Sequence, residues 1–174
     1  MNRTVFSEYP FPLNRVLSFR PDAAALVLGS DAYPGIRGIV RFYQTRSGVV
    51  VSAQITGLPI GESLCGDRIF GFHIHEGSAC EGDATDPFAA TGMHYNPDNC
   101  EHPYHAGDLP PLFGNNGLAV SVFLTDRFTV NEIIEKAIII HDQRDDFTTN
   151  PSGDAGTKIA CGIIRRDFEN AKWF

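Results

Sequence analysis

The chain has 174 residues, of which 43% are hydrophobic and 20% are charged, and its formal net charge is −7 at pH 7. This length and composition are those of one globular domain, so we expect a single domain over residues 1–174. The acidic charge argues against nucleic acid or an anionic membrane surface as partner, and no apolar run approaches the roughly 20 residues that cross a bilayer. Residues 1–19 lack the basic start and apolar stretch of a secretion signal. This predicts a cytoplasmic protein, or an extracytoplasmic one if a leader has been removed.

Eight short segments rich in β-branched and aromatic residues are separated by Gly, Pro, Ser or Asp, the pattern of β-strands joined by turns. They cover residues 23–29, 37–44, 49–56, 68–75, 108–113, 118–124, 137–141 and 158–165. Helical periodicity is almost absent beyond one turn within 128–136, so the pattern predicts an all-β, antiparallel sandwich or barrel. Its core should span about residues 23–165, with an irregular extension at 1–20 and a tail at 166–174.

All six histidines lie between positions 73 and 141, in or around a loop of about thirty residues at 76–107. A stretch that long without apolar periodicity is usually functional or disordered. His73 and His75 precede the loop in a run of strand character, so both imidazoles should leave the same face of the strand. Two neighbouring imidazoles provide half of a transition-metal site, although a pair of exposed surface histidines fits the same spacing.

Three further histidines and an aspartate follow within 15 positions: His94, His102, His105 and Asp108. Nitrogen and oxygen ligands in this number fit a tetrahedral zinc site, and the alternative is a solvated polar loop with incidental histidines. His141 ends a predicted strand and is followed by Asp145. A carboxylate at that place can accept a hydrogen bond from a metal-bound imidazole, although Asp145 alone would be an ordinary surface acid.

Five motifs occur in one order along the chain: GFHIHE, GMHYNP, HAGDLP, IIIHDQRDD and GDAGTKIACGII. In this order they resemble the copper–zinc superoxide dismutase family, from about Ala23 to Arg165. The resemblance implies an eight-stranded antiparallel Greek-key β-barrel or sandwich, immunoglobulin-like, with long metal-binding loops and the metals on its outer face. It implies that superoxide is converted to oxygen and hydrogen peroxide through a copper redox cycle, while zinc is structural.

The resemblance also assigns residues to the site. The copper ligands it implies are His73, His75, His94 and His141. The zinc ligands it implies are His94, His102, His105 and Asp108. The imidazole of His94 then bridges the metals and carries a proton for the second half-reaction. Asp145 matches the aspartate that links one copper ligand to one zinc ligand, and Cys80 and Cys161 match the intrasubunit disulfide.

Three features depart from the family. Lys158 stands where the family has an arginine beside copper; it keeps the charge that attracts an anion but lacks the planar fork. We expect Lys158 to take the catalytic role of that arginine and the activity to survive at a reduced rate; the alternative is that Lys158 is a plain surface residue at the end of a strand. Only two residues separate His102 from His105, a shorter span than the family usually has. One of these two histidines is therefore expected to have difficulty reaching the zinc. The segment from Asp145 to Lys158 is short and holds no lysine before Lys158, which leaves Arg144 to supply part of any electrostatic guidance.

Cys65 and Cys100 lie outside the family pattern. A second disulfide between them would restrict the unfolded freedom of an unusual loop, whereas two free thiols fit a cytoplasmic setting better. The sequence leaves both alternatives open.

Two functions from different classes fit the chain. One is superoxide dismutase; the other is a superoxide dismutase-like metal-binding protein with weak or no dismutase activity. The complete set of copper ligands favours the enzyme, and Lys158 favours the alternative. A zinc hydrolase fits poorly, because nothing places Glu76 over a zinc-bound water. A homodimer is also compatible with the sequence.

Overall fold

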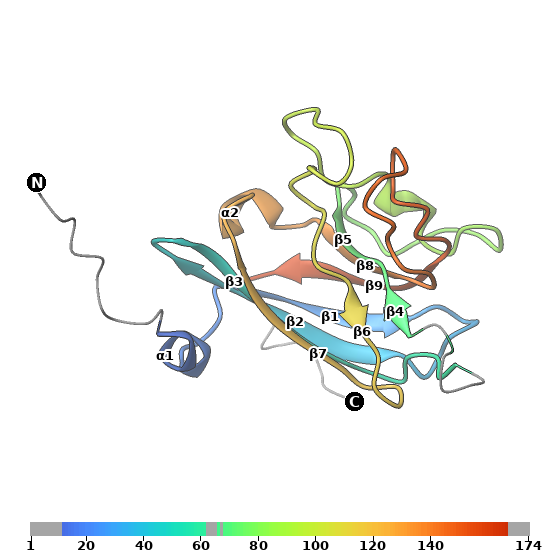
Figure 1. The fold of residues 1–174 in the computed structure, drawn as a ribbon, viewed down its shortest axis with the longest axis horizontal. Helices are drawn as coiled ribbons and strands as arrows, with labels where there is room; N and C mark the ends of the chain where they lie inside the picture. The colour runs from blue at the N-terminus through green and yellow to red at the C-terminus, as the bar shows by residue number, and fades with distance from the viewer. Residues whose placement is uncertain (1–11, 62–65, 67, 167–174) are drawn as a thin grey trace, which may run out of the picture.

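The structure is a computed structural model that describes residues 12–61, 66 and 68–166 (Figure 1). Its strands are β1 (Ala23–Gly29), β2 (Arg37–Thr45), β3 (Gly48–Thr56), β4 (Ile69–Phe70), β5 (Phe72–His75), β6 (Leu112–Phe113), β7 (Ala119–Thr125), β8 (Ala137–His141) and β9 (Lys158–Arg165). The helices are α1 (Leu13–Ser18), α2 (Val130–Ile133) and the 3₁₀ turn η1 (Ala89–Thr91). Among the described helices, none is both long and apolar enough to span a bilayer.

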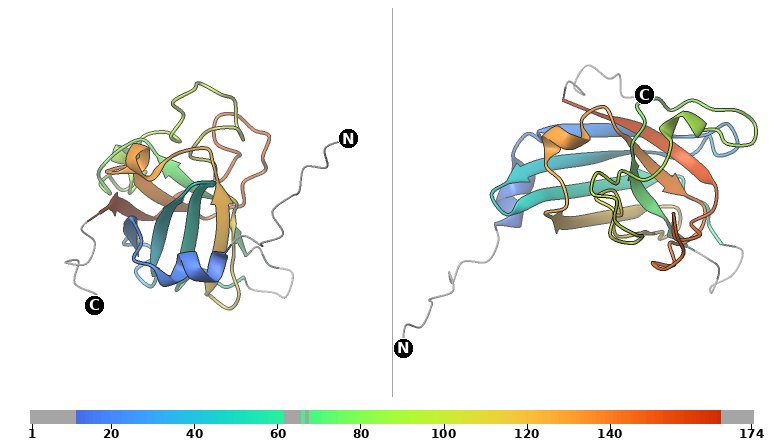
Figure 2. Two further views of the ribbon diagram at one scale, coloured as in Figure 1. Left: turned by 90° about the vertical axis from the view of Figure 1, so that its left-hand side faces the viewer. Right: turned by 90° about the horizontal axis from the view of Figure 1, so that it is seen from above.

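Seven strands form one curled antiparallel sheet in the order β5-β8-β9-β1-β2-β3-β7, and β4 pairs with β6 in a second, short sheet (Figures 1 and 2). The short sheet connects the two edges of the long one. β4 continues into the edge strand β5 through Gly71, and β6 contacts the opposite edge strand β7. Because long connections bring non-consecutive strands such as β1 and β9 together, the topology is of the Greek-key kind. The predicted antiparallel barrel is confirmed.

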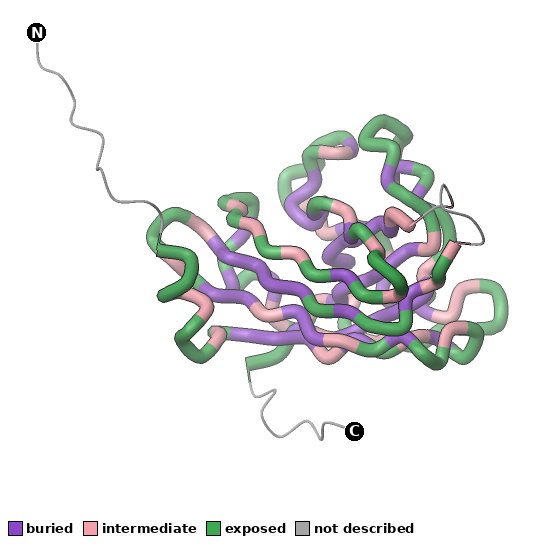
Figure 3. The backbone as a smooth tube through the Cα atoms, turned by 60° about the horizontal axis from the view of Figure 1, so that its bottom comes forward, coloured by how far each residue is buried: buried purple, intermediate pink, exposed green. Residues whose placement is uncertain are grey.

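The core lies inside the curled sheet and is formed mainly by alternate residues of the long strands. Figure 3 shows how buried residues follow one another along these strands. In β5, the side chains of Phe72 and Ile74 join this core, and both are fully buried. Strand alternation then sends His73 and His75 to the other face, as predicted. Those two imidazoles are also buried, because loops cover that face.

Gly71 breaks the predicted strand 68–75 into β4 and β5. Its N–H donates to Gln143 O at 2.7 Å, and its carbonyl accepts the N–H of His141 at 2.8 Å. A Cβ at this position would lie 2.9 Å from the Cβ of Ala155, so only glycine allows the loop to approach this closely. The break therefore docks the segment of residues 142–157 onto the barrel.

Two other expectations need correction. The predicted strand 108–113 is reduced to β6, since Pro110 and Pro111 have no N–H with which to extend a ladder. The extension 1–20 is not wholly irregular, because Leu13–Ser18 forms α1, a short helix without a buried residue. The predicted helical turn within 128–136 is present as α2, which begins with a capping box formed by Thr129 and Glu132.

The two long loops, residues 76–107 and 142–157, lie together over β5 and β8 at the top of the view in Figure 1. His102 connects them, because its N–H donates to Asn150 Oδ1 at 2.9 Å. All six histidines lie on or beside these loops and are buried. The barrel thus supplies one wall of a site whose other walls are loops.

Candidate metal centre

A first group of ligand atoms gathers where β5 and β8 meet the loops. It comprises one ring nitrogen from each of four buried histidines, all within 4.8 Å of one another: His73, His75, His94 and His141. β5 and β8 are paired, which fixes three of these residues on the barrel. His94 comes from the loop, and its backbone pairs with that of His75. The centroids of the His73 and His94 rings are 4.0 Å apart.

A second group lies on the other side of His94. It comprises one ligand atom from each of His94, His102, His105 and Asp108, again within 4.8 Å of one another. The Oδ1 atom of Asp108 is 2.7 Å from His94 Nδ1, and its Oδ2 atom is 3.1 Å from His102 Nδ1 and 3.3 Å from His105 Nδ1. Both His102 and His105 therefore reach the group, and the short span between them does not exclude either.

Asp145 joins the two groups. Its Oδ2 atom accepts a hydrogen bond from His73 Nε2 and its Oδ1 atom accepts one from His102 Nε2, each at 2.8 Å. Oδ1 also accepts the N–H of Phe147 at 2.7 Å. The close approach requires Gly153, where a Cβ would lie 2.0 Å from Oδ1 of Asp145. Asp145 thus lies between one histidine of each group.

Hydrogen bonds fix which nitrogen of each ring faces its group. His73 and His102 donate from Nε2 to Asp145, while His75 donates from Nδ1 to Gly92 O at 2.9 Å and His141 from Nδ1 to Gly156 O at 3.2 Å. The opposite nitrogen of each ring then carries a lone pair. The Nε2 atoms of His75 and His141 are only 3.4 Å apart, so two lone pairs face each other there. A cation bound between the two Nε2 atoms would be coordinated by both lone pairs and would remove their mutual repulsion.

Four ring nitrogens are buried and have no hydrogen-bond partner among the described residues: His73 Nδ1, His94 Nε2, His102 Nδ1 and His105 Nδ1. His102 Nδ1 and His105 Nδ1 lie near Asp108, but the angles do not make hydrogen bonds. Unsatisfied buried polar atoms cost about 1–3 kcal/mol each, so such a cluster needs an explanation. Two bound metal ions would satisfy all four atoms, and the donor set, imidazole with one carboxylate, suits both copper and zinc.

Burial keeps three histidines of the first group neutral, namely His73, His75 and His141. It lowers the pKa values of His73 and His75 well below 6.5, and the charges of His94 and His141 lower them further. Burial likewise lowers the pKa of His141 to about 4. For Asp108, burial raises the pKa, but the hydrogen bond from His94 and the charges of three histidines outweigh it and leave the pKa below 3.8. Neutral imidazoles and an ionised carboxylate are the forms that bind metals.

Lys158 begins β9 and lies opposite His141 in the β8–β9 register. Its Nζ donates to Asp86 Oδ2 at 2.8 Å and to Phe88 O at 3.2 Å. Its charge also contributes to the lowered pKa of His141, its neighbour in that register. The sequence did not single out Asp86, since one acid in a polar loop is an ordinary surface residue.

The predicted disulfide between Cys80 and Cys161 is formed and ties the loop 76–107 to β9. Cys100 is exposed and has no disulfide with any residue that the structure describes, while Cys65 lies outside the described residues. The pairing of Cys65 with Cys100 stays a prediction.

Arg127 is a second residue that the sequence did not reveal. It lies between β7 and α2, and its Nη1 lies within hydrogen-bonding distance of three backbone carbonyls of the loop that carries the second group. The distances are 3.0 Å to Pro103 O and 3.2 Å to both His105 O and Asp108 O. The guanidinium thus holds the loop to the barrel. Contacts to backbone carbonyls leave no pattern in a sequence.

The stability of the metal-free protein should depend on pH through the buried histidines. Unfolded imidazoles titrate near pH 6.5, whereas His141 resists protonation in the fold until about pH 4. Between these values the unfolded chain binds more protons, so the free energy of unfolding should decrease as the pH falls. His141 alone contributes about 3 kcal/mol over this window. Urea unfolding of metal-free protein at several pH values tests this, and a flat profile between pH 6.5 and 4 would contradict it.

Removing the disulfide should destabilise the fold. The bond closes a loop with a sequence separation of 81, for which replacement of both cysteines by serine should cost about 2–4 kcal/mol. The matched control is Cys100→Ser, at an exposed thiol, which should change the free energy of unfolding by less than about 0.5 kcal/mol. Denaturant unfolding measures both. An equal effect of the two changes would show that the bond does not stabilise the native state.

Arg127→Met should release the loop of residues 103–108 and lower the free energy of unfolding by about 1–3 kcal/mol, because hydrogen bonds from a charged donor are lost. Amide hydrogen exchange of residues 104–108 should become faster. Arg165→Met is the control, since Arg165 is exposed and its Nη2 lies 3.7 Å from Oε2 of Glu135, which is also exposed. Unchanged exchange in the Arg127 variant would refute the role given to this residue.

Comparison with known proteins agrees with this geometry. The profile of the family described as copper/zinc superoxide dismutase (SODC) matches residues 36–164. Cu-Zn superoxide dismutase 5 of Dictyostelium discoideum is 34% identical in an alignment of 148 residues that covers 75% of this chain and 90% of that protein.

Two solved structures have a similar fold. The Cu/Zn superoxide dismutase from Brucella abortus superposes with a TM-score of 0.67 at 26% identity, over 81% of this chain and 98% of that one. A double mutant of a SOD-like protein from Bacillus subtilis gives a TM-score of 0.65 at 28% identity, over 80% of this chain and 95% of that one. The profile match covers most of the chain and includes every residue of the two ligand groups. The chain belongs to the copper/zinc superoxide dismutase family.

Proposed function

We propose that the first group of ligand atoms binds copper, that the second binds zinc, and that the side chain of His94 serves both. The chain is a superoxide dismutase by family, with superoxide as substrate and copper and zinc as cofactors. The observation that carries the assignment of residues is the convergence of unpartnered, buried ring nitrogens on two points either side of His94. Geometry therefore supports one ligand set per metal, joined by one shared imidazole.

The reaction turns two superoxide ions and two protons into oxygen and hydrogen peroxide. Copper, when bound, supplies the reversible one-electron chemistry that this conversion needs, since imidazole ligands suit both of its oxidation states. His73, His75 and His141 hold their positions through Asp145, Gly92 O and Gly156 O, respectively. Their role is to present three neutral nitrogens from a rigid wall of the barrel.

We assign to His94 the role of holding a proton between the two groups. Its Nε2 atom faces the first group and is buried without a hydrogen-bond partner, while its Nδ1 atom is 2.7 Å from Asp108 Oδ1. A proton at Nε2 would therefore lie beside the site where superoxide is converted, shielded from bulk water. Zinc-side contacts to Asp108 keep the ring in this orientation.

Lys158 supplies a positive charge beside the first group. Its ammonium uses two of its three N–H donors on Asp86 and Phe88, which leaves one donor for an anion. Lysine lacks the fork of arginine, so it can contact a diatomic anion at one point only. We assign to it the attraction of superoxide.

A single domain over residues 1–174, a homodimer and a cytoplasmic location (or an extracytoplasmic one if a leader has been removed) stay predictions, as does the absence of nucleic acid and membrane partners. A metal-binding relative with weak or no dismutase activity would differ from the enzyme only in its turnover of superoxide. Measuring the rate of superoxide consumption by the metal-loaded protein distinguishes the two.

Substitutions should separate the two metal sites. His141→Ala removes a ligand of the first group alone, so copper content and dismutase activity should fall at least 100-fold while zinc is retained. His105→Ala removes a ligand of the second group alone and should lower zinc content first. Metal analysis by mass spectrometry, superoxide consumption and circular dichroism measure these outcomes. Near-normal activity of the folded His141 variant at full copper loading would show that the assignment is wrong.

A further inference from the structure

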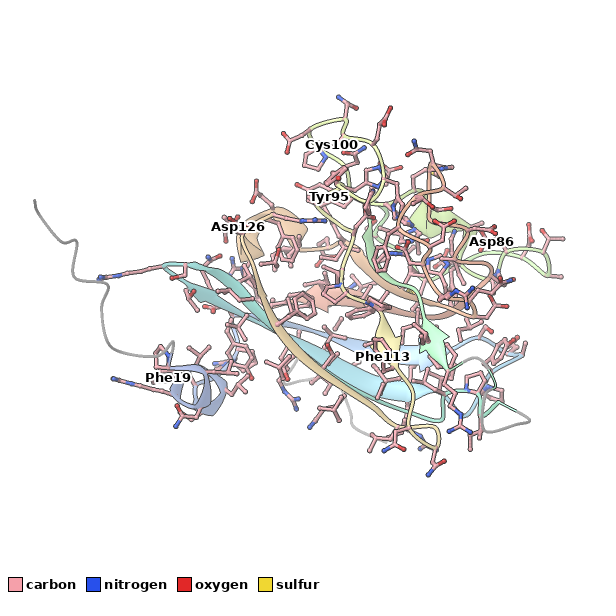
Figure 4. All side chains as sticks on the ribbon, in the orientation of Figure 1. Phe19, Asp86, Tyr95, Cys100, Phe113 and Asp126 are labelled. Carbon is pink, nitrogen blue, oxygen red and sulfur yellow. A yellow bond between two sulfur atoms is a disulfide. The ribbon has the colours of Figure 1, made fainter. Side chains whose placement is uncertain are left out.

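Lys158 ends in an ion pair at the edge of the first group. Its side chain is 14% exposed and that of Asp86 is 40% exposed, and 2.8 Å separate Nζ from Oδ2. Asp86 belongs to the loop 76–107 and is labelled at the right of Figure 4. The pair thus has its cation nearly buried and its anion facing solvent.

The loop presents Asp86 to the lysine through a turn. The other carboxylate oxygen of Asp86, Oδ1, accepts the N–H of Phe88 at 3.0 Å, which is a side-chain turn of the kind that aspartate commonly makes. Phe88 in turn offers its carbonyl to Nζ at 3.2 Å. Two neighbouring residues of one turn therefore hold the ammonium, and Asp86 contributes the only charge of the two.

The ion pair with Asp86 weakens the electrostatic attraction of Lys158 for an anion in solution. An ammonium and a carboxylate in contact nearly cancel beyond their own separation, so little attraction reaches an anion in solution. A cavity of about 870 Å³ beside the pair adds further acids, since its lining includes Asp31, Glu81 and Asp83. An anion that approaches from that side meets negative charge before it meets Lys158.

We propose that Asp86 is a positioning residue that restrains Lys158 and sets how strongly this cation attracts anions to the first group. It holds the ammonium against the turn at residues 86–88 and cancels its long-range charge. This inference rests on the proposed function, because Lys158 acts on superoxide only if the first group binds copper. The present sequence therefore attracts its substrate less strongly than its own lysine allows.

Asp86→Asn removes the negative charge beside Lys158 while it preserves the turn at residues 86–88. Asparagine keeps an oxygen for the N–H of Phe88 but has no charged oxygen for Lys158. At low ionic strength kcat/KM should rise about 3- to 10-fold, at the lower end of the range for electrostatic steering. The gain should shrink as ionic strength exceeds about 0.15 M, where the screening length is roughly 8 Å. Asp86→Ser, which also preserves such a turn, is a second variant should the first fail to fold.

The matched control is Glu81→Gln, which removes the same charge from the same loop without touching Lys158. Its effect on kcat/KM should be less than twofold. In a Lys158→Ala background, Asp86→Asn should lose its advantage over Glu81→Gln. Equal gains from the two single changes, or no gain from Asp86→Asn, would overturn the proposal.

Two further measurements do not depend on turnover. Azide binding to the copper-loaded protein, followed by absorption, should be about 3- to 10-fold tighter in Asp86→Asn than in Glu81→Gln. In metal-free protein, reductive methylation read by peptide mass spectrometry should modify Lys158 faster in Asp86→Asn than in wild type. Unchanged labelling and azide affinity would overturn the role of Asp86. Absence of dismutase activity in the copper- and zinc-loaded wild type would overturn the proposed function instead, and the labelling result would still stand.

Discussion

The buried carboxylate of Asp145 is the contact on which the site depends. One oxygen binds His73 on β5, the other binds His102 in the loop 76–107, and Asp145 itself belongs to the segment 142–157. Burying a carboxylate costs several kcal/mol, and its hydrogen bonds from two imidazoles and from the N–H of Phe147 offset that cost. Asp145 thereby links the two loops to each other and to the barrel.

The orientation of the rings follows from the same constraint. A ring that donates from Nε2 to Asp145 must direct its Nδ1 lone pair the opposite way, and His73 and His102 therefore face different groups. The barrel completes the arrangement, because carbonyls of Gly92 and Gly156 orient His75 and His141. Preorganisation of this kind leaves little for a metal ion to reorder when it binds.

The sequence predicted the parts of the site that depend on periodicity and order along the chain. Strand alternation placed His73 and His75 on one face, and the order of five motifs pointed to the right family and to the Cys80–Cys161 disulfide. It could not show that Gly71 would break a strand, since the break comes from a loop that docks there. Asp86 and Arg127 escaped notice because their partners are a lysine 72 positions away and backbone carbonyls, and neither kind of contact leaves a sequence pattern.

Charge in this molecule is divided between the interior and the rim. Inside, the buried carboxyl groups of Asp108 and Asp145 contact imidazoles of both groups, and burial keeps His73, His75 and His141 neutral. Carboxylates without compensating charge are unfavourable in a buried place, so the interior favours cations, and metal binding must contribute to folding. At the rim, Lys158 would favour anions, but Asp86 cancels much of its charge. The charges inside the fold therefore favour the binding of metal ions, whereas the charges at the rim attract an anionic substrate only weakly. The net charge of −7 opposes the approach of an anion as well.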